Sequence, residues 1–210
     1  MSRSNYKYRV YNGKIIKDIL KNSKIYLLVL LFTAGILIGS LFVSSSTGLS
    51  ISNLNNIISA YVRAKTEQGI LQNFIMSASV NMVLSVLSVF LGFSLIGYPF
   101  VAWLPFLKGM GVGAFSGYMY LNYKMTGLAY CVILIYPGAI VSALAYILSC
   151  CDSFEYSKNA YDKSIRAKGQ FERDETRIFL FRQFIYILVC LCSSFIESLF
   201  SAVFSGLFNI

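Results

Sequence analysis

The sequence contains no histidine, only three prolines and few charged residues. Charged side chains make up 13% of its 210 residues, whereas a typical soluble domain has about 25%. Without histidine, the chain lacks the commonest general base and the commonest metal ligand. The composition therefore argues against a soluble globular enzyme and against a histidine-based metal site.

Cysteine does not indicate a metal site either. The five cysteines lie in or at the edge of apolar segments, and no two form a CxxC pair. They are Cys131, Cys150, Cys151, Cys190 and Cys192. We expect them to act as small packing residues, and we predict no metal and no cofactor.

What the chain has in abundance is apolar residues, at 57% of the total. Residues 25–43 carry no charge and are numerous enough to cross the roughly 30 Å hydrocarbon core as a helix. A basic segment precedes them, as in a signal peptide, but the apolar run exceeds a usual signal core and no cleavage site is convincing. We interpret this segment as a retained anchor.

Residues 74–121 form a second apolar block, in which Lys108 is the only charge. The block is too long for one span, and Gly97 and Pro99 favour a break because glycine permits a turn and proline suits the first turn of a helix. The predicted spans are residues 25–43, 74–96, 99–121, 126–149 and 184–208. The fold class predicted is an all-α polytopic membrane protein, with a single transmembrane domain over 25–210.

Lysine and arginine indicate the orientation. Seven lie in residues 1–24 and seven in the charged loop 150–183, but only two in residues 44–73. With five spans, both rich segments fall on one side, which we expect to be cytoplasmic, leaving the C-terminus outside. Topology and contact with anionic membrane lipids account for the net charge of +9, so we predict no nucleic-acid partner.

Amphipathic segments flank the first span. Residues 14–24 predict a basic helix at the cytoplasmic interface, so that residues 1–24 form a basic cytoplasmic or interfacial N-terminus. On the outer side, apolar residues recur with helical spacing. This outer amphipathic face comprises Leu54, Ile57, Ile58, Tyr61 and Val62. Two interpretations are open: the face lies on the outer leaflet, or it docks a partner.

Glycine is concentrated in residues 105–117. Gly109, Gly113 and Gly117 are spaced by four, so they line one face of a helix and allow another helix to approach closely. That face either packs within one chain or forms the seam of a homo-oligomer. A phosphate-binding loop is excluded because no GK[ST] ending follows.

Lys108 needs a separate explanation, because a charge near mid-bilayer costs about 2.5–3.5 kcal/mol. Glu197 is the one carboxylate within a predicted span, and its depth differs from that of Lys108 by roughly 6 Å at 1.5 Å per residue. We predict that the two form an intramembrane charge pair. The alternative is that Lys108 snorkels or meets carbonyls freed by prolines, while Glu197 is protonated or faces an aqueous cleft.

Residues 92–120 resemble the centre of the stage II sporulation protein M family, which carries a G-x-S-x-x-G-x-P block followed by an F-x-KG-x-x-x-G block. The matching residues here are Gly92, Ser94, Gly97, Pro99, Phe106, Lys108, Gly109 and Gly113. The chain length, the basic amphipathic N-terminus, the five spans and the N-inside topology are also similar to those of the family.

The resemblance implies a part in endospore formation. The family is a multi-pass component of the engulfment machinery in the cell membrane of sporulating bacteria, and works with the septal peptidoglycan hydrolases, stage II sporulation proteins P and D. It implies a non-enzymatic scaffold that localises these partners for septal thinning and engulfment, with no catalytic residues. The glycine- and proline-broken spans leave one alternative, a transporter or permease component for a lipid or small solute.

Overall fold

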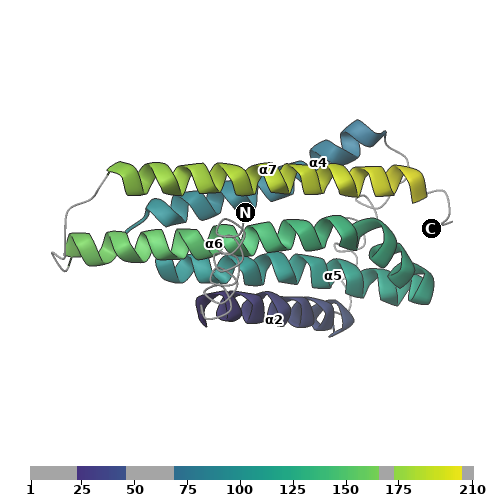
Figure 1. Cartoon of the computed structure of the whole chain (residues 1–210). Coiled ribbons are helices and arrows are strands. Elements are labelled where there is room, and N and C mark those ends of the chain that lie inside the picture. The colour runs from purple at the N-terminus through teal and green to yellow at the C-terminus, as the bar shows by residue number, and fades with distance from the viewer. Residues whose placement is uncertain (1–22, 46–68, 166–172, 205–210) are drawn as a thin grey trace, which may run out of the picture.

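The computed structural model of this chain describes residues 23–45, 69–165 and 173–204. Within these ranges the structure is helical and contains no strand, so the all-α class predicted from the sequence is confirmed. In chain order the elements are α2 (Ser23–Ser45), α4 (Ile70–Phe93), α5 (Tyr98–Tyr130), the π-helical turn η1 (Cys131–Ile135), α6 (Tyr136–Ile165) and α7 (Arg173–Phe204) (Figure 1).

Four helical stretches of the described residues are long and apolar enough to cross a membrane. They are Ser23–Ser45, Ile70–Phe93, Tyr98–Ser164 and Asp174–Val203. The third has 67 residues, although a bilayer requires only about 20. It doubles back near Lys124, whose φ of 50° and ψ of −127° are not helical, and α5 and α6 therefore run antiparallel (Figure 1). These helices mark a multi-pass membrane protein.

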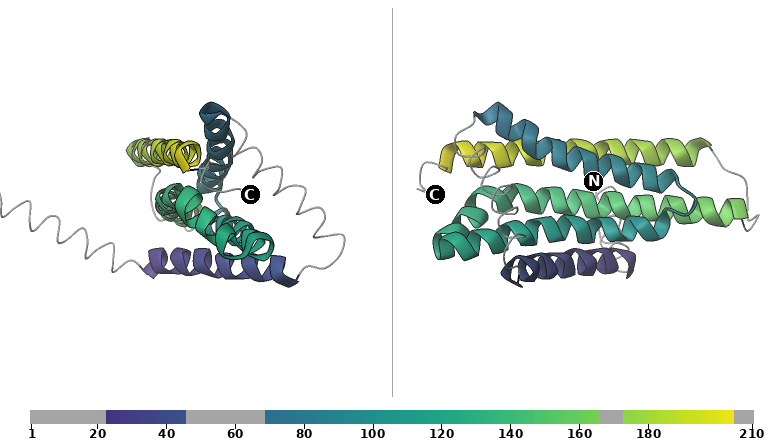
Figure 2. Two further views of the ribbon diagram at one scale, coloured as in Figure 1. Left: turned by 90° about the vertical axis from the view of Figure 1, so that its right-hand side faces the viewer. Right: turned by 180° about the vertical axis from the view of Figure 1, so that it is seen from behind.

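The helices form a bundle with α5 and α6 in the middle (Figure 1). Helices α4 and α7 lie on one side of this central pair, and α2 lies on the other, where it crosses obliquely (Figure 2). At one end of the bundle, the C-terminal part of α6 and the N-terminal part of α7 project beyond the neighbouring helices (Figure 1).

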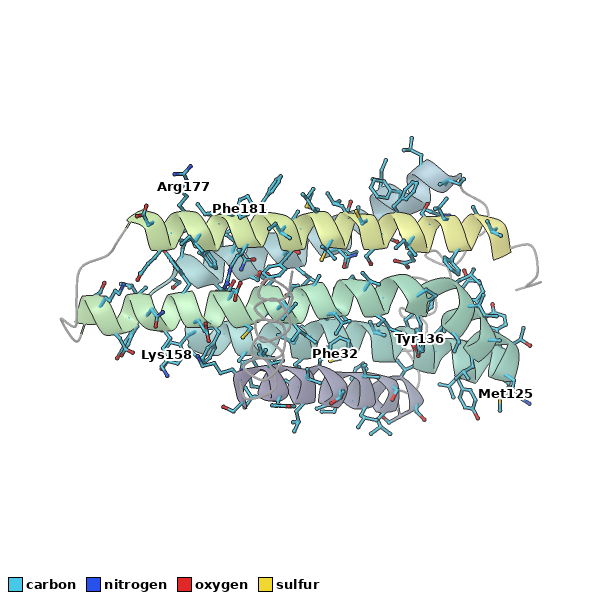
Figure 3. The ribbon with its side chains drawn as sticks, viewed as in Figure 1. Phe32, Met125, Tyr136, Lys158, Arg177 and Phe181 are labelled. Atoms are coloured by element: carbon cyan, nitrogen blue, oxygen red, sulfur yellow. The ribbon has the colours of Figure 1, made fainter. Side chains whose placement is uncertain are left out.

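Large apolar side chains cover the outside of the bundle, while its interior is rich in serine. Exposed examples are Leu30 and Leu41 on α2, Leu71, Val83 and Phe90 on α4, Trp103 on α5, and Phe181 and Val203 on α7; Phe181 points away from the bundle in Figure 3. A soluble protein rarely exposes so much apolar surface. Lipid solvates them at no cost, and the interior can then use small and polar side chains to hold helices together.

An apolar cluster joins α2, α5 and α6. Leu28 of α2, Val101 and Leu104 of α5, and Tyr146 of α6 are all buried in it. Phe32 of α2 packs against this cluster from the edge and lies between α2 and the central pair in Figure 3. The cluster fixes the position of α5, which carries Lys108.

The turn between α4 and α5 is short. Helix α4 ends at Phe93, and the Gly97 amide donates to the Ser94 carbonyl at 3.1 Å. Pro99 lies in the first turn of α5, where its missing N–H costs no helical hydrogen bond. A Cβ at Gly97 would collide with the Leu91 carbonyl oxygen, so only glycine fits this return of the chain.

The second reversal combines three irregular features. After the non-helical Lys124, α5 resumes and leads into the π-helical turn Cys131–Ile135. Pro137 follows directly in α6, and because proline lacks an N–H, it cannot complete a regular ladder at that point. A π-helical turn is one way in which a helix accommodates such an interruption.

Where the structure describes it, the charged loop 150–183 between the last two predicted spans is helical. Helix α6 continues to Ile165 and α7 begins at Arg173, eleven residues before the last span predicted from the sequence. An apolar run marks only the part of a helix that lies in lipid, whereas these helices continue into a charged end. Lys158 and Arg177 lie at this end of the bundle, and Met125 lies at the opposite end (Figure 3).

Candidate functional site

Lys108 lies on the side of α5 that faces α4 and α6. Its Nζ donates hydrogen bonds to Asn81 Oδ1 at 3.2 Å and to Ser142 Oγ at 3.3 Å. The same nitrogen lies 4.8 Å from the centroid of the Tyr146 ring, within the range of a cation–π contact. Protein groups thus replace water around a charge that is otherwise costly in the membrane.

The contacts of Lys108 extend to a fourth helix. Asn81 of α4 donates through Nδ2 to Ser194 Oγ of α7 at 3.0 Å, and the Ser194 hydroxyl in turn donates to the Cys190 carbonyl. Since Ser142 belongs to α6, the network links α4, α5, α6 and α7. Lys108 is therefore the point at which four helices are joined by polar contacts.

Glu197 lies in α7 and is 8% exposed. It lines the same cavity as Lys108, a space of about 440 Å³ between α4, α5 and α6. The structure thus brings the two predicted partners to one cavity. The hydrogen bonds of Lys108 Nζ go to Asn81 and Ser142, so a direct ion pair with Glu197 stays a prediction.

Sequence reasoning missed the polar residues that surround Lys108, although a signal for them was present. They belong to a wider pattern of buried serines, which recur along three of the apolar helices mostly at spacings of three, four, seven or eight residues and so stay near one face. The buried stripes are Ser77, Ser85 and Ser88 on α4, Ser142, Ser149, Ser153 and Ser157 on α6, and Ser193, Ser194, Ser198 and Ser201 on α7. The sequence-based prediction considered only the charged residues and the glycines, so the spacing of the serines was not recognised as a signal.

A second polar contact set lies between α4, α6 and α7, centred on Gln183, which is 2% exposed. Its Oε1 accepts from Ser149 Oγ at 2.6 Å, and its Nε2 donates to the Ser149 carbonyl and to Ser153 Oγ. Ser149 Oγ also lies 2.9 Å from Ser88 Oγ of α4. Every polar atom of the Gln183 side chain is thereby satisfied without water.

The predicted glycine row packs against α2 of the same chain. A Cβ at Gly109 would collide with the Phe32 carbonyl oxygen, and one at Gly113 with the Ile36 carbonyl oxygen. From the α2 side, Gly35 and Gly39 meet the backbone of α5 in the same way. Gly117 approaches Ser40, where a Cβ would lie 3.1 Å from the Ser40 Cα. Of the two interpretations of this row, packing within one chain describes the structure.

Other residues of the resemblance also lie between helices. A Cβ at Gly92 of α4 would lie 3.0 Å from Phe179 Cζ of α7 and 3.2 Å from Ser153 Cβ of α6. The Ser94 carbonyl accepts from Ser157 Oγ of α6 at 2.6 Å. The block from residue 92 onward therefore specifies how closely α4 and α5 approach their neighbours.

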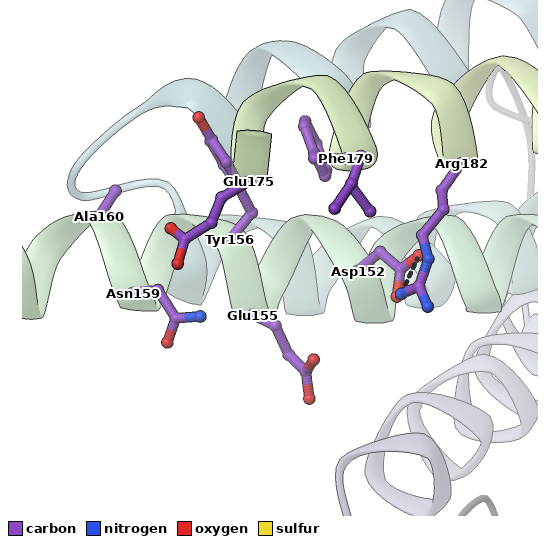
Figure 4. Close-up of a pocket in the computed structure, with 9 residues that line it drawn as sticks. Asp152, Glu155, Tyr156, Asn159, Ala160, Glu175, Phe179 and Arg182 are labelled. Atoms are coloured by element: carbon purple, nitrogen blue, oxygen red, sulfur yellow. Dashed lines mark hydrogen bonds and ion pairs between the residues drawn. The ribbon is translucent and has the colours of Figure 1, made fainter. Parts of the chain in front are cut away.

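A second cavity, of about 240 Å³, lies between the projecting ends of α6 and α7 (Figure 4). Its carboxylates have basic partners: Asp152 pairs with Arg182, and Glu175 with Lys163. Glu155 pairs with Lys24 of α2, with Nζ 2.7 Å from Oε1. These ion pairs tie α2, α6 and α7 together at the charged end.

The rings of Tyr156 and Phe179 stack beside this second cavity, with centroids 4.3 Å apart and planes inclined by 12°. The outer amphipathic face, from Leu54 to Val62, lies outside the described residues. So does most of the predicted basic N-terminus, residues 1–24.

Comparison with known proteins identifies a family. The model of the family described as stage II sporulation protein M matches residues 28–202. Neither a curated protein nor a solved structure matches the chain. The matched range covers most of every described helix and includes Lys108, the glycine row of α5 and Glu197. The chain therefore belongs to the stage II sporulation protein M family.

Proposed function

We propose that this protein is a non-enzymatic membrane scaffold of endospore formation, which localises septal peptidoglycan hydrolases for septal thinning and engulfment. The observation that carries the proposal is the family match over residues 28–202. The motif residues Gly92, Gly97, Gly109 and Gly113 all lie at close approaches between chain segments. This block therefore encodes an architecture, as expected of a protein whose task is to position others.

The proposed topology has five spans, with the N-terminus and the segment 150–183 in the cytoplasm. The ion pair between Lys24 and Glu155 supports it, because it joins the two segments that are rich in lysine and arginine at one end of the bundle. Reporter fusions after Lys158 and after Ile210 should report opposite sides of the membrane. Signals from the same side would contradict the five-span topology.

Recruitment of partners is assigned to the outer amphipathic face. The tagged chain, isolated from sporulating membranes, should bring down stage II sporulation proteins P and D. Replacing Ile57, Ile58 and Tyr61 together by serine should lower this recovery several-fold while membrane abundance is unchanged, because the apolar stripe is lost but no predicted span is altered.

The matched control replaces Asn55, Asn56 and Ser59 by alanine, since the helical spacing of the sequence predicts these residues to lie away from the apolar face. It should leave recovery unchanged. Equal recovery of the hydrolases by the triple serine variant and by this control would show that the outer amphipathic face does not bind them. Failure of the unaltered chain to recover either hydrolase would contradict the scaffold itself.

The cavity beside Lys108 favours a second candidate, a permease component for a lipid or small solute. Cavities lined by broken helices and charged residues are also features of transporters. Substrate flux into vesicles that contain the purified chain, or co-purification of a nucleotide-binding subunit, would favour this candidate over the scaffold.

A further inference from the structure

The cavity beside Lys108 opens toward the lipid. Much of its wall is apolar, and it includes Val80 and Leu84 of α4 and Leu107 and Phe115 of α5. Val80 is 56% exposed and Leu107 is 47% exposed, so the cavity reaches the outer surface between these two helices. Its volume of about 440 Å³ falls within the range of roughly 300–1,000 Å³ that is usual for ligand sites.

Polar groups line the inner wall of the same cavity. Lys108 is held there by Asn81 and Ser142, and Glu197 lines the wall from α7. Ser77 is 5% exposed, and its Oγ has no hydrogen-bond partner among the described residues. A buried hydroxyl without a partner is costly, so Ser77 is a polar contact that a bound molecule would complete.

The charges of the wall select the kind of molecule. One ammonium and one carboxylate line the cavity, so an anionic head would face Glu197 and a cationic head would face Lys108. A hydroxyl group suits both, because it donates to a carboxylate and accepts from an ammonium or a serine.

We propose that this cavity binds a membrane lipid with a neutral, hydroxyl-bearing head, such as glycerol or a sugar. The head contacts Ser77, Lys108 and Glu197, and the acyl chain leaves between Val80 and Leu107. This inference is independent of the scaffold function, since hydrolase recruitment and lipid binding are measured separately.

The test uses the purified full chain in phosphatidylcholine nanodiscs, with native mass spectrometry as the readout. The probe is monooleoylglycerol. Methyl oleate has the same chain without hydroxyls, and free glycerol has the head without the chain. We expect saturable binding of monooleoylglycerol, at least about tenfold weaker binding of methyl oleate, in line with lost hydrogen bonds to a polar site, and no binding of glycerol.

Two variants locate the site. Ser77→Ala should weaken binding about three- to tenfold, the effect of one hydrogen bond, without lowering thermal stability, because the hydroxyl has no protein partner. Gly111→Leu should abolish binding, since Gly111 lines the cavity and a Cβ there meets nothing within 4 Å. Ser79→Ala is the control: Ser79 is exposed on the same helix and donates to the Ile75 carbonyl.

The proposal is overturned if no probe binds, which would leave water as the occupant of the cavity. It is also overturned if methyl oleate binds as tightly as monooleoylglycerol, or if glycerol binds without the chain. Equal affinities of the Ser77→Ala and Ser79→Ala variants would exclude this cavity as the site.

Discussion

The two sides of the bundle hold their helices together by different means. Where α2 meets α5, glycines allow the backbones to touch, and Cβ atoms at Gly109 or Gly113 would collide with carbonyl oxygens of α2. Where α4, α6 and α7 meet, hydrogen-bonded side chains such as Gln183 and Asn81 bridge the helices. In lipid, where apolar contact between helices gains little over contact with acyl chains, these are the two main sources of affinity between helices.

Residues 105–117 serve both interfaces. Gly109 and Gly113 turn toward α2, while Lys108 faces Asn81 and Ser142 on the other side of α5. Successive residues of a helix point about 100° apart at 3.6 residues per turn, so neighbours in sequence can face different partners. Lys108 is adjacent to the glycines in sequence because α5 lies between the two interfaces, with α2 on one side and α4 and α6 on the other.

The largest effect is expected at the polar interface, from an unpartnered charge. Lys108→Met or Glu197→Gln should each lower membrane abundance, with a cost of about 3–5 kcal/mol if the two form a buried pair. The double variant Lys108→Met/Glu197→Leu should recover folding, because no charge is left buried. Steric-trapping measurements of unfolding in bilayers, together with abundance, would test this. Additive losses in the double variant would mean that the two residues are not partners.

A second double-mutant cycle, between Lys108 and Asn81, tests a contact that the structure shows directly. Lys108 Nζ donates to Asn81 Oδ1 in the structure, so the cycle of Lys108→Met with Asn81→Leu should give a coupling energy of about 0.6–1.7 kcal/mol, the range measured for hydrogen bonds in membranes. Zero coupling to Asn81 would contradict the contact.

The next largest effect is a steric one, at the interface between α2 and α5. Gly113→Leu should destabilise the protein by about 3 kcal/mol, the upper part of the range for overpacking, because α2 has to move away from α5. Gly111→Leu is the matched control: a Cβ at Gly111 meets nothing within 4 Å, so unfolding should change little. Equal losses for both variants would show that a larger side chain on α5 destabilises the protein regardless of contact with α2, since leucine is the better helix former and propensity alone would stabilise both.

A smaller effect is expected at Gln183. Gln183→Leu removes the hydrogen bonds to Ser149 and Ser153 and should cost about 1 kcal/mol, the usual scale in a membrane. Gln72→Leu, on the exposed side of α4, should cost nothing measurable. If both variants unfold like the unaltered chain, the hydrogen bonds of Gln183 add nothing to the free energy of unfolding, and the interface is held together by packing alone.

The smallest effect is expected at the charged end, outside the lipid. Glu175→Gln removes the ion pair with Lys163, and an exposed pair contributes only about 0.2–1 kcal/mol. The loss should vanish in high salt, because salt screens exposed charges. A loss that persists in 1 M salt would indicate a buried pair, contrary to the 45% exposure of the Glu175 side chain.

The helical class, the apolar helices and the family followed from the sequence, because lipid imposes long apolar runs that composition alone exposes. The chain reversal at Gly97 and Pro99 was also signalled, since each residue has a specific backbone use there. Lys108 and Glu197 stood out as charges in apolar segments, and the structure places both on one cavity.

The partners of Lys108 could not be assigned in the same way. Asn81 and Ser142 are common residue types at unremarkable positions, and only the rotation of α4 and α6 brings them within 3.3 Å of Nζ. The glycine row carried two interpretations because its spacing suits any closely packed helix. Its partner, Gly35 and Gly39 of α2, lies some seventy residues earlier in the chain.

Disulfide cross-linking between α2 and α5 in native membranes tests the account most directly, in a background without the five native cysteines. A Cβ at Gly117 would lie 3.4 Å from the Ser40 Cβ, close to the Cβ separation of about 3.5–4.5 Å in disulfides. Oxidation of a Ser40→Cys/Gly117→Cys variant should therefore link the helices within one chain, and a Ser40→Cys/Gly111→Cys control should not link. A covalent dimer from the first variant, with no link inside the monomer, would contradict the account and make the glycine row a seam between copies.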